Sequence, residues 1–105
     1  MDKNAVLKII SRFQKTLESK GIRINKTILF GSCVMGLQKE ESDIDIVVIS
    51  EDFKNKGYWE RIAILSDVIY EIFEPIEAVA MTKEEWEKGD SFIVNYAKNG
   101  EVVYG

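Results

Sequence analysis

Two aspartates one residue apart open the most apolar run of this chain, and they constrain the fold more than any other feature. The run reads Asp43-Ile44-Asp45-Ile46-Val47-Val48-Ile49. Its β-branched composition predicts a strand that is buried on both faces. Because successive side chains of a strand point to opposite faces, both aspartates share one face, roughly 6.5 Å apart along the chain. Like charges on one face repel, so the pair indicates a site rather than an ordinary strand end.

An earlier apolar run ends in a glycine and a serine, in the order Leu29-Phe30-Gly31-Ser32, and ten residues separate it from the aspartates. Glycine lets the backbone approach a ligand closely, and a serine at a strand-to-helix turn adds a hydroxyl to free N–H groups, which suits a phosphate. By itself this pair is equally an ordinary turn with an N-cap serine. Two carboxylates on a rigid face suit Mg²⁺, which also accepts phosphate oxygens. Together the two motifs predict a site for a metal and a triphosphate.

This combination resembles the signature of the nucleotidyltransferase (polymerase beta-like) superfamily, in which Gly31-Ser32 is followed after ten residues by Asp43-x-Asp45, with Ser42 before the first acid. The short chain is similar to the minimal members, the MNT proteins, over residues 24–81. The resemblance implies a Mg²⁺-dependent enzyme, with two metal ions, that transfers NMP from an NTP to a hydroxyl of a partner protein or small molecule. ATP is the expected donor. It also implies an HEPN-type helical protein as partner, in a toxin–antitoxin pair of which this chain is the antitoxin.

The resemblance assigns roles to individual residues. Asp43 and Asp45 would hold the metal ions, while Gly31 and Ser32 would bind the phosphates. The third carboxylate of the family, usually an aspartate, is best matched by Glu77, which would complete the metal site and act as general base. Glu77 is the one charge inside an apolar strand, where burying it unpaired would be costly. The alternative is an exposed acid on an edge strand, and Glu74 and Glu71 are the fallback candidates.

A second departure from the family pattern concerns positive charge. Met35 stands where the family commonly has arginine, and a methionine there is expected to pack in the core. The triphosphate would then be neutralised by the metal and the backbone, or by Lys26 or Lys39. Cys33 is interpreted as a small buried residue, since no partner that would stabilise a thiolate is evident.

Composition narrows the class of protein. The chain has 105 residues, a net charge of −4 and a pI near 4.9, which argue against a protein that binds duplex nucleic acid. It has no histidine, so acid–base chemistry falls to carboxylates. No apolar stretch approaches the ~20 residues of a membrane span, there is no signal-peptide pattern, and the one cysteine cannot form an internal disulfide. We expect a cytoplasmic protein without a membrane partner.

Hydrophobic periodicity predicts an α/β (α+β) fold, a mixed sheet of three to five strands with flanking helices, in a single domain over residues 1–105. Strands are expected at 22–30, 43–49 and 76–81, with a small edge strand at 102–104. Helices are expected at 3–19, closed by Gly21, at 59–73, stopped by Pro75, from a capping box at Thr82 and Glu85 through 86, and at 92–97. A helical turn at 33–37 and loops at 38–42 and 53–57 complete the chain. The predicted buried stripe of the second long helix is Ile62, Leu65, Ile69, Ile72 and Phe73.

Other functions stay open at this point. The chain could be a binding subunit with weak or no catalysis that sequesters a helical partner, which Met35 and Glu77 favour. Larger relatives carry an acceptor domain, so a partner or a second copy of this chain must supply that half of the site. A glycosyltransferase with a D-x-D motif needs a much larger fold, and an EF-hand fails because Val48 occupies its glycine position. Aromatic side chains are assigned to the core rather than to a nucleotide base: Tyr58, Trp59, Tyr70, Trp86, Tyr96 and Tyr104.

Overall fold

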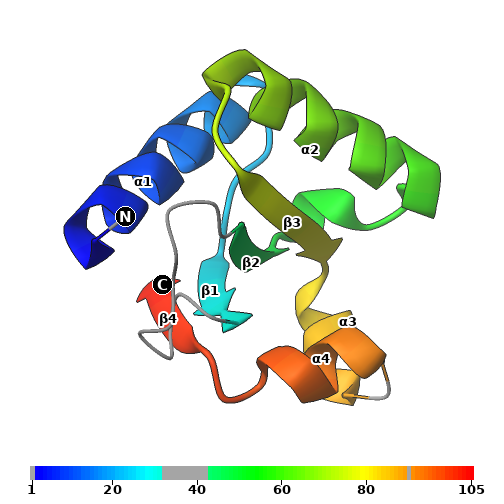
Figure 1. Cartoon of the computed structure of the whole chain (residues 1–105). Helices are drawn as coiled ribbons and strands as arrows, with labels where there is room; N and C mark the ends of the chain where they lie inside the picture. Colours follow the sequence, from blue (N-terminus) through cyan, green and yellow to red (C-terminus); the bar gives the residue numbers. More distant parts are fainter. Residues whose placement is uncertain (1, 32–42, 90) are drawn as a thin grey trace.

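The computed structural model describes residues 2–31, 43–89 and 91–105 (Figure 1). Its elements in chain order are α1 (Lys3–Ser19), β1 (Lys26–Phe30), β2 (Ile44–Ile49), the short 3₁₀ helix η2 (Glu51–Phe53), α2 (Tyr58–Ile72), β3 (Ile76–Met81), α3 (Lys83–Lys88), α4 (Phe92–Ala97) and β4 (Glu101–Tyr104). The helical turn predicted at 33–37 and the loop at 38–42 lie outside the described residues. No helix in the described ranges is long and apolar enough to cross a membrane.

The four described strands form one mixed sheet in the order β3-β2-β1-β4. β2 pairs with β1 antiparallel and with β3 parallel, and β4 adds an antiparallel edge to β1. This arrangement confirms the predicted mixed sheet with flanking helices. All residues of β2 except Asp45 are buried, as its continuous apolar composition predicted.

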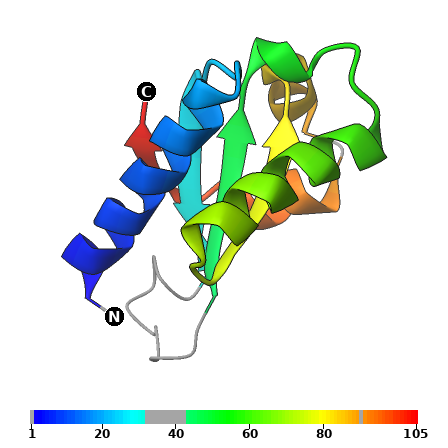
Figure 2. The ribbon, with the colours of Figure 1, turned by 90° about the horizontal axis from the view of Figure 1, so that it is seen from above.

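Helices cover both faces of the sheet (Figure 2). α1 and α2 pack on one face, over a core that includes Leu29, Ile44, Ile46 and Val48. The opposite face carries a smaller core, in which Val94 and Ala97 of α4 pack on side chains from three strands: Ile28, Phe30, Val47, Ile49 and Met81. Since strand side chains alternate, Asp45 projects to the same face as Val47, toward α4.

α1 begins at an N-cap, where Asp2 accepts a hydrogen bond from Ala5 N at 2.8 Å.

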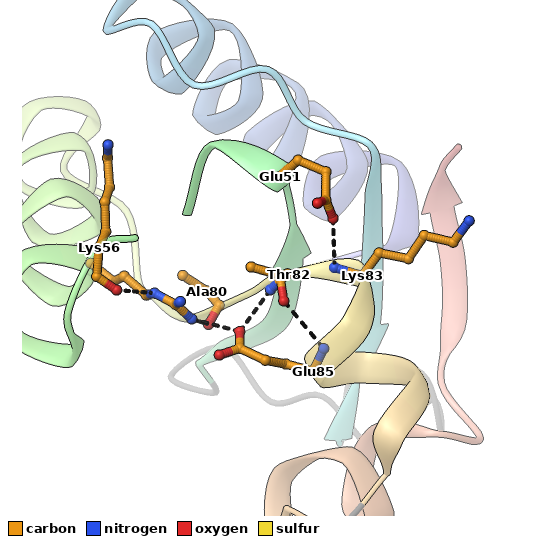
Figure 3. Close-up of polar contacts among 7 residues, drawn as sticks. Glu51, Lys56, Ala80, Thr82, Lys83 and Glu85 are labelled. Atoms are coloured by element: carbon orange, nitrogen blue, oxygen red, sulfur yellow. Dashed lines mark hydrogen bonds and ion pairs between the residues drawn. The ribbon is translucent and has the colours of Figure 1, made fainter. Parts of the chain in front are cut away.

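A polar network ties α2, β3 and α3 together (Figure 3). Thr82 and Glu85 form the predicted capping box at the start of α3. Arg61 of α2 donates to Glu85 Oε1 at 2.6 Å and to the backbone oxygen of Lys56 at 3.0 Å. The network lies at the end of β3 that is remote from Glu77, and it holds the edge strand between two helices.

The first strand is shorter than predicted. It begins at Lys26, not at residue 22, although Ile22 and Ile24 are buried. The backbone of the intervening Arg23 bonds to side chains instead: Ser50 Oγ donates to its oxygen at 2.5 Å, and its N–H donates to Asp52 at 2.7 Å. The alternation of Ile22 and Ile24 therefore reports burial rather than strand pairing.

The predicted buried stripe of α2 is partly wrong. Phe73 is 86% exposed and Ile62 36%, while Val68, absent from the prediction, is fully buried with Leu65 and Ile72. The helix ends at Ile72 because Phe73 takes the left-handed conformation at φ 55°, which redirects its side chain. α2 begins and ends one residue earlier than predicted, and β2 begins one residue later.

The assignment of the aromatic side chains to the core is also wrong for most of them. Many aromatic and large aliphatic side chains are exposed: Tyr58, Trp59, Ile62, Tyr70, Phe73, Phe92, Tyr96, Val102 and Tyr104.

Along α2, residues spaced by three or four positions form one exposed band, which we name the α2 stripe: Trp59, Ile62, Ala63, Ser66, Tyr70 and Phe73. Helical spacing alone could not distinguish this stripe from the core stripe, because α2 carries apolar residues on two of its sides.

Candidate active site

Strand register brings Asp45 and Glu77 together. Asp45 of β2 is the register partner of Glu77 in β3 and of Phe30 in β1. Register partners lie side by side on one face of a sheet, so the three side chains form a row across it, which we name the acidic row. The row lies on the face toward α4, close to the end of β1 from which Gly31 follows.

Gly31 follows β1 and lies beside the acidic row. We call the place where they meet the corner. Its φ is +78°, a conformation that residues with a Cβ rarely adopt, and the carboxylate of Asp45 fills the space beside its Cα. The glycine is therefore required both for its backbone angle and for the proximity of Asp45. Ser32, the second predicted phosphate ligand, lies outside the described residues.

The carboxylates of the site shift one another's pKa values. Partial burial raises the pKa of Asp45, the hydrogen bond with Glu77 acts in the opposite direction, and the charge of Asp43 raises it further. A hydrogen bond with Asp43 is the largest cause that raises the pKa of Glu77, followed by burial and by the charges of Asp43 and Asp45. Both directions follow from three carboxylates that lie close enough to interact.

The donor set suits a hard cation in its chemistry. Carboxylate oxygens are the ligands that Mg²⁺ prefers, and the mutual repulsion of the three acids is what a cation relieves. Among the described residues, however, no group of three or more acidic, histidine or cysteine side chains is arranged to hold a metal ion as it stands. Ligation by all three would therefore need a movement of side chains.

The structure separates Glu77 from its fallback candidates. Glu74 pairs with Arg12 at 3.5 Å and Glu71 with Lys20 at 3.2 Å, both toward α1 rather than toward the acidic row. Glu77 itself is exposed, and β3 is an edge strand, so the cost of burying an unpaired charge does not apply to it. Its distinguishing feature is its register with Asp45.

The proposed basic residues do not reach this corner from the described part of the chain. Lys26 begins β1, at the end of the strand opposite to Gly31, and its register partner is Ile49. Phe30 lies four positions further along the strand than Lys26, or about 13 Å away. Lys39, Met35 and Cys33 lie outside the described residues.

A cavity of about 570 Å³ opens on the acidic row. Asp45 and Glu77 line it together with Phe30, Phe92 and Tyr96. A larger cavity, of about 660 Å³, lies along β3 and α2 and contains none of the predicted site residues. We place the site in the smaller cavity because it holds the interacting carboxylates. The contribution of α4 was missed from the sequence, because its aromatic side chains fit the pattern of a buried helix.

The sequence model of the nucleotidyltransferase domain family matches residues 10–99 of this chain. The chain belongs to the nucleotidyltransferase family. The match includes Gly31, both aspartates and Glu77, and it confirms the family to which the sequence motifs pointed. No curated protein matches the chain significantly.

Solved structures share the nucleotidyltransferase fold. A Sulfolobus solfataricus protein assigned as a nucleotidyltransferase has a TM-score of 0.71 and 18% identity, over 93% of this chain and 78% of its own. A toxin–antitoxin complex with AMP-PNP has a TM-score of 0.63 and 21% identity, over 94% of this chain and 73% of its own. The toxin–antitoxin MntA–HpeT, with two aspartates one residue apart changed to glutamate, has a TM-score of 0.60 and 20% identity, over 100% and 74%.

Proposed function

We propose that this chain transfers a nucleoside monophosphate from a Mg²⁺-bound nucleoside triphosphate, with ATP as donor, to a hydroxyl of a partner protein or small molecule. The observation that carries the proposal is the convergence of Asp43, Asp45 and Glu77 beside Gly31, in a chain of the nucleotidyltransferase family. The donor is supported by a structural relative that was solved with AMP-PNP. Another relative carries its substitutions on two aspartates with the spacing of Asp43 and Asp45.

The residues of the corner divide the chemistry between them. Asp43 and Asp45 would hold Mg²⁺, which when bound neutralises phosphate charge and stabilises the attacking and leaving oxygens. The acceptor oxygen attacks the α-phosphorus, the bond from phosphorus to the oxygen bridging to the β-phosphate breaks, and pyrophosphate leaves. Glu77 would accept the hydroxyl proton, a role that its raised pKa favours.

The acceptor is proposed to be a helical protein partner. Two of the structural relatives are toxin–antitoxin complexes. The α2 stripe supports a protein partner, since Trp59, Tyr70 and Phe73 are each more than three-quarters exposed in a continuous band. Exposed apolar surface of this kind marks interaction sites.

The experiment combines the protein with Mg²⁺ and ATP, alone and co-expressed with the protein encoded by the adjoining gene, and measures the mass of both chains. We expect one chain to gain the mass of AMP. Asp43→Asn should abolish the gain, whereas Asp67→Asn, an exposed acid on α2, should leave it unchanged. Transfer that persists in Asp43→Asn would contradict the proposal.

A binding subunit without catalysis is the second candidate, and the α2 stripe favours it equally. Such a protein would form a stable complex with its partner in the presence of Mg²⁺ and ATP, without any gain of mass. Asp43→Asn would then leave the affinity of the complex unchanged, while Tyr70→Ser on the α2 stripe would weaken it.

A further inference from the structure

Two exposed aromatic side chains of α4 stand beside the acidic row. Phe92 is 81% exposed and Tyr96 61%. Their rings are nearly parallel, with planes 15° apart and centroids separated by 6.4 Å. Tyr96 also meets Phe30 edge to face, with centroids 5.6 Å apart. Phe30 belongs to the acidic row, so this contact places Tyr96 directly beside the strand that leads into Gly31.

The lining of the cavity restricts what could cover these rings. Phe92 and Tyr96 share the cavity with Asp45 and Glu77, and its volume of about 570 Å³ is in the range of small-ligand pockets. Apart from Asp45 and Glu77, the described lining residues are apolar or aromatic, a surface suited to an uncharged ring. Exposed aromatic faces bind flat rings by stacking, and they do so with little dependence on which base is presented.

We propose that Phe92 and Tyr96 form a stacking platform for the nucleobase of the triphosphate. The inference rests on the proposed function, because it is the phosphate end of the same molecule that brings the base to the acidic row. A nucleobase is flat, uncharged and covalently joined to the group on which the carboxylates act. The platform therefore supplies affinity for the nucleoside part of the triphosphate.

The test compares two ligands that share the phosphate chain, of which only ATP carries a nucleoside. Calorimetric titration with ATP and with inorganic tripolyphosphate, both in Mg²⁺, should show ATP binding about 5- to 100-fold more tightly. The double variant Phe92→Leu, Tyr96→Leu should lose this preference and keep its affinity for tripolyphosphate. Tyr58→Leu, at an exposed tyrosine outside both the cavity and the α2 stripe, should keep both affinities, and Tyr96→Phe should keep the preference for ATP.

The outcomes separate the platform from the proposed function. Wild-type protein that binds neither ligand contradicts the proposed function and the platform with it. A preference for ATP that survives in the double variant overturns the platform alone, and assigns the rings to another ligand such as the acceptor. A second measurement needs no variant: stacking should move the adenine H2 and H8 resonances upfield when ATP binds to the wild type, and unmoved resonances would likewise overturn the platform.

Discussion

The carboxylate of Asp45 lies against Gly31, so that a Cβ atom at position 31 would stand 2.5 Å from Asp45 Oδ2. Gly31→Ala therefore has two effects. The left-handed φ of +78° should cost about 1–2 kcal/mol of stability. The clash should also displace Asp45, and a displacement of about 1 Å at an active site lowers the rate roughly 100-fold. Denaturant unfolding and the rate of AMP transfer measure the two effects.

Gly21→Ala is the matched control for this substitution. Gly21 has a φ of +93°, but no atom lies within 4 Å of an added Cβ. Its substitution should lower stability to a similar extent and leave nucleotidyl transfer intact. Equal loss of activity in both variants would show that backbone strain, rather than the position of Asp45, limits the reaction.

Neutralising the acidic row should stabilise the protein when Mg²⁺ is absent. The pKa values of Asp45 and Glu77 are raised in the folded state, so stability falls as the pH rises from the ordinary carboxyl pKa through the raised values, and stays lower above them. At pH 7, Asp45→Asn and Glu77→Gln should each raise the Tm by a few degrees at most, because solvent screens these partly exposed groups. Thermal melts with EDTA measure the change.

The same melts with Mg²⁺ test the assignment of the cation site. Mg²⁺ should raise the Tm of the wild type, because the cation binds the folded state and relieves the repulsion. Asp45→Asn should lose most of this rise, and Asp67→Asn should retain it. A wild-type Tm that does not respond to millimolar Mg²⁺ would argue against a cation among these carboxylates in the free protein.

The left-handed conformation of Phe73 lowers the stability of the fold. A bulky residue at φ 55° is strained, and at 86% exposure its ring gains little from packing within the chain. Phe73→Gly should raise the free energy of unfolding by up to about 1 kcal/mol, as the strain is removed at the cost of greater freedom in the unfolded chain. Tyr70→Gly, inside the regular helix, should lower it by a similar amount. Urea unfolding compares the two.

Glu85 predicts an acid-sensitive contact. Burial acts to raise the pKa of Glu85, but hydrogen bonds from Arg61 and Thr82 and the charge of Arg61 outweigh it and leave the pKa below its ordinary value. The contact therefore stabilises the fold above the ordinary pKa and is lost as the pH falls through the lowered one. Glu85→Gln should cost up to about 1 kcal/mol at pH 7, and progressively less as the pH falls through the lowered pKa. Glu87→Gln, a neighbour on the same helix, should leave the stability unchanged over this pH range.

Local patterns account for most elements of this fold. The apolar run after Asp43 predicted a buried strand, and β2 confirms it. The capping box at Thr82 and Glu85 marks the start of α3 in sequence as it does in space. These features depend on residues within a few positions of one another, and short-range geometry is the part of folding that a sequence expresses directly.

The sequence by itself determined the family and the order of its elements, because both reside in local spacing. Tertiary structure alone decided that Glu77 is the register partner of Asp45, since pairing between β2 and β3 depends on the crossover through α2. It also decided which apolar residues stay exposed. Most residues of the α2 stripe, like Phe92 and Tyr96, are as apolar as core residues. Each helix, however, packs on the sheet with only one of its sides. An apolar side chain on another side of the helix remains in solvent whatever its hydrophobicity.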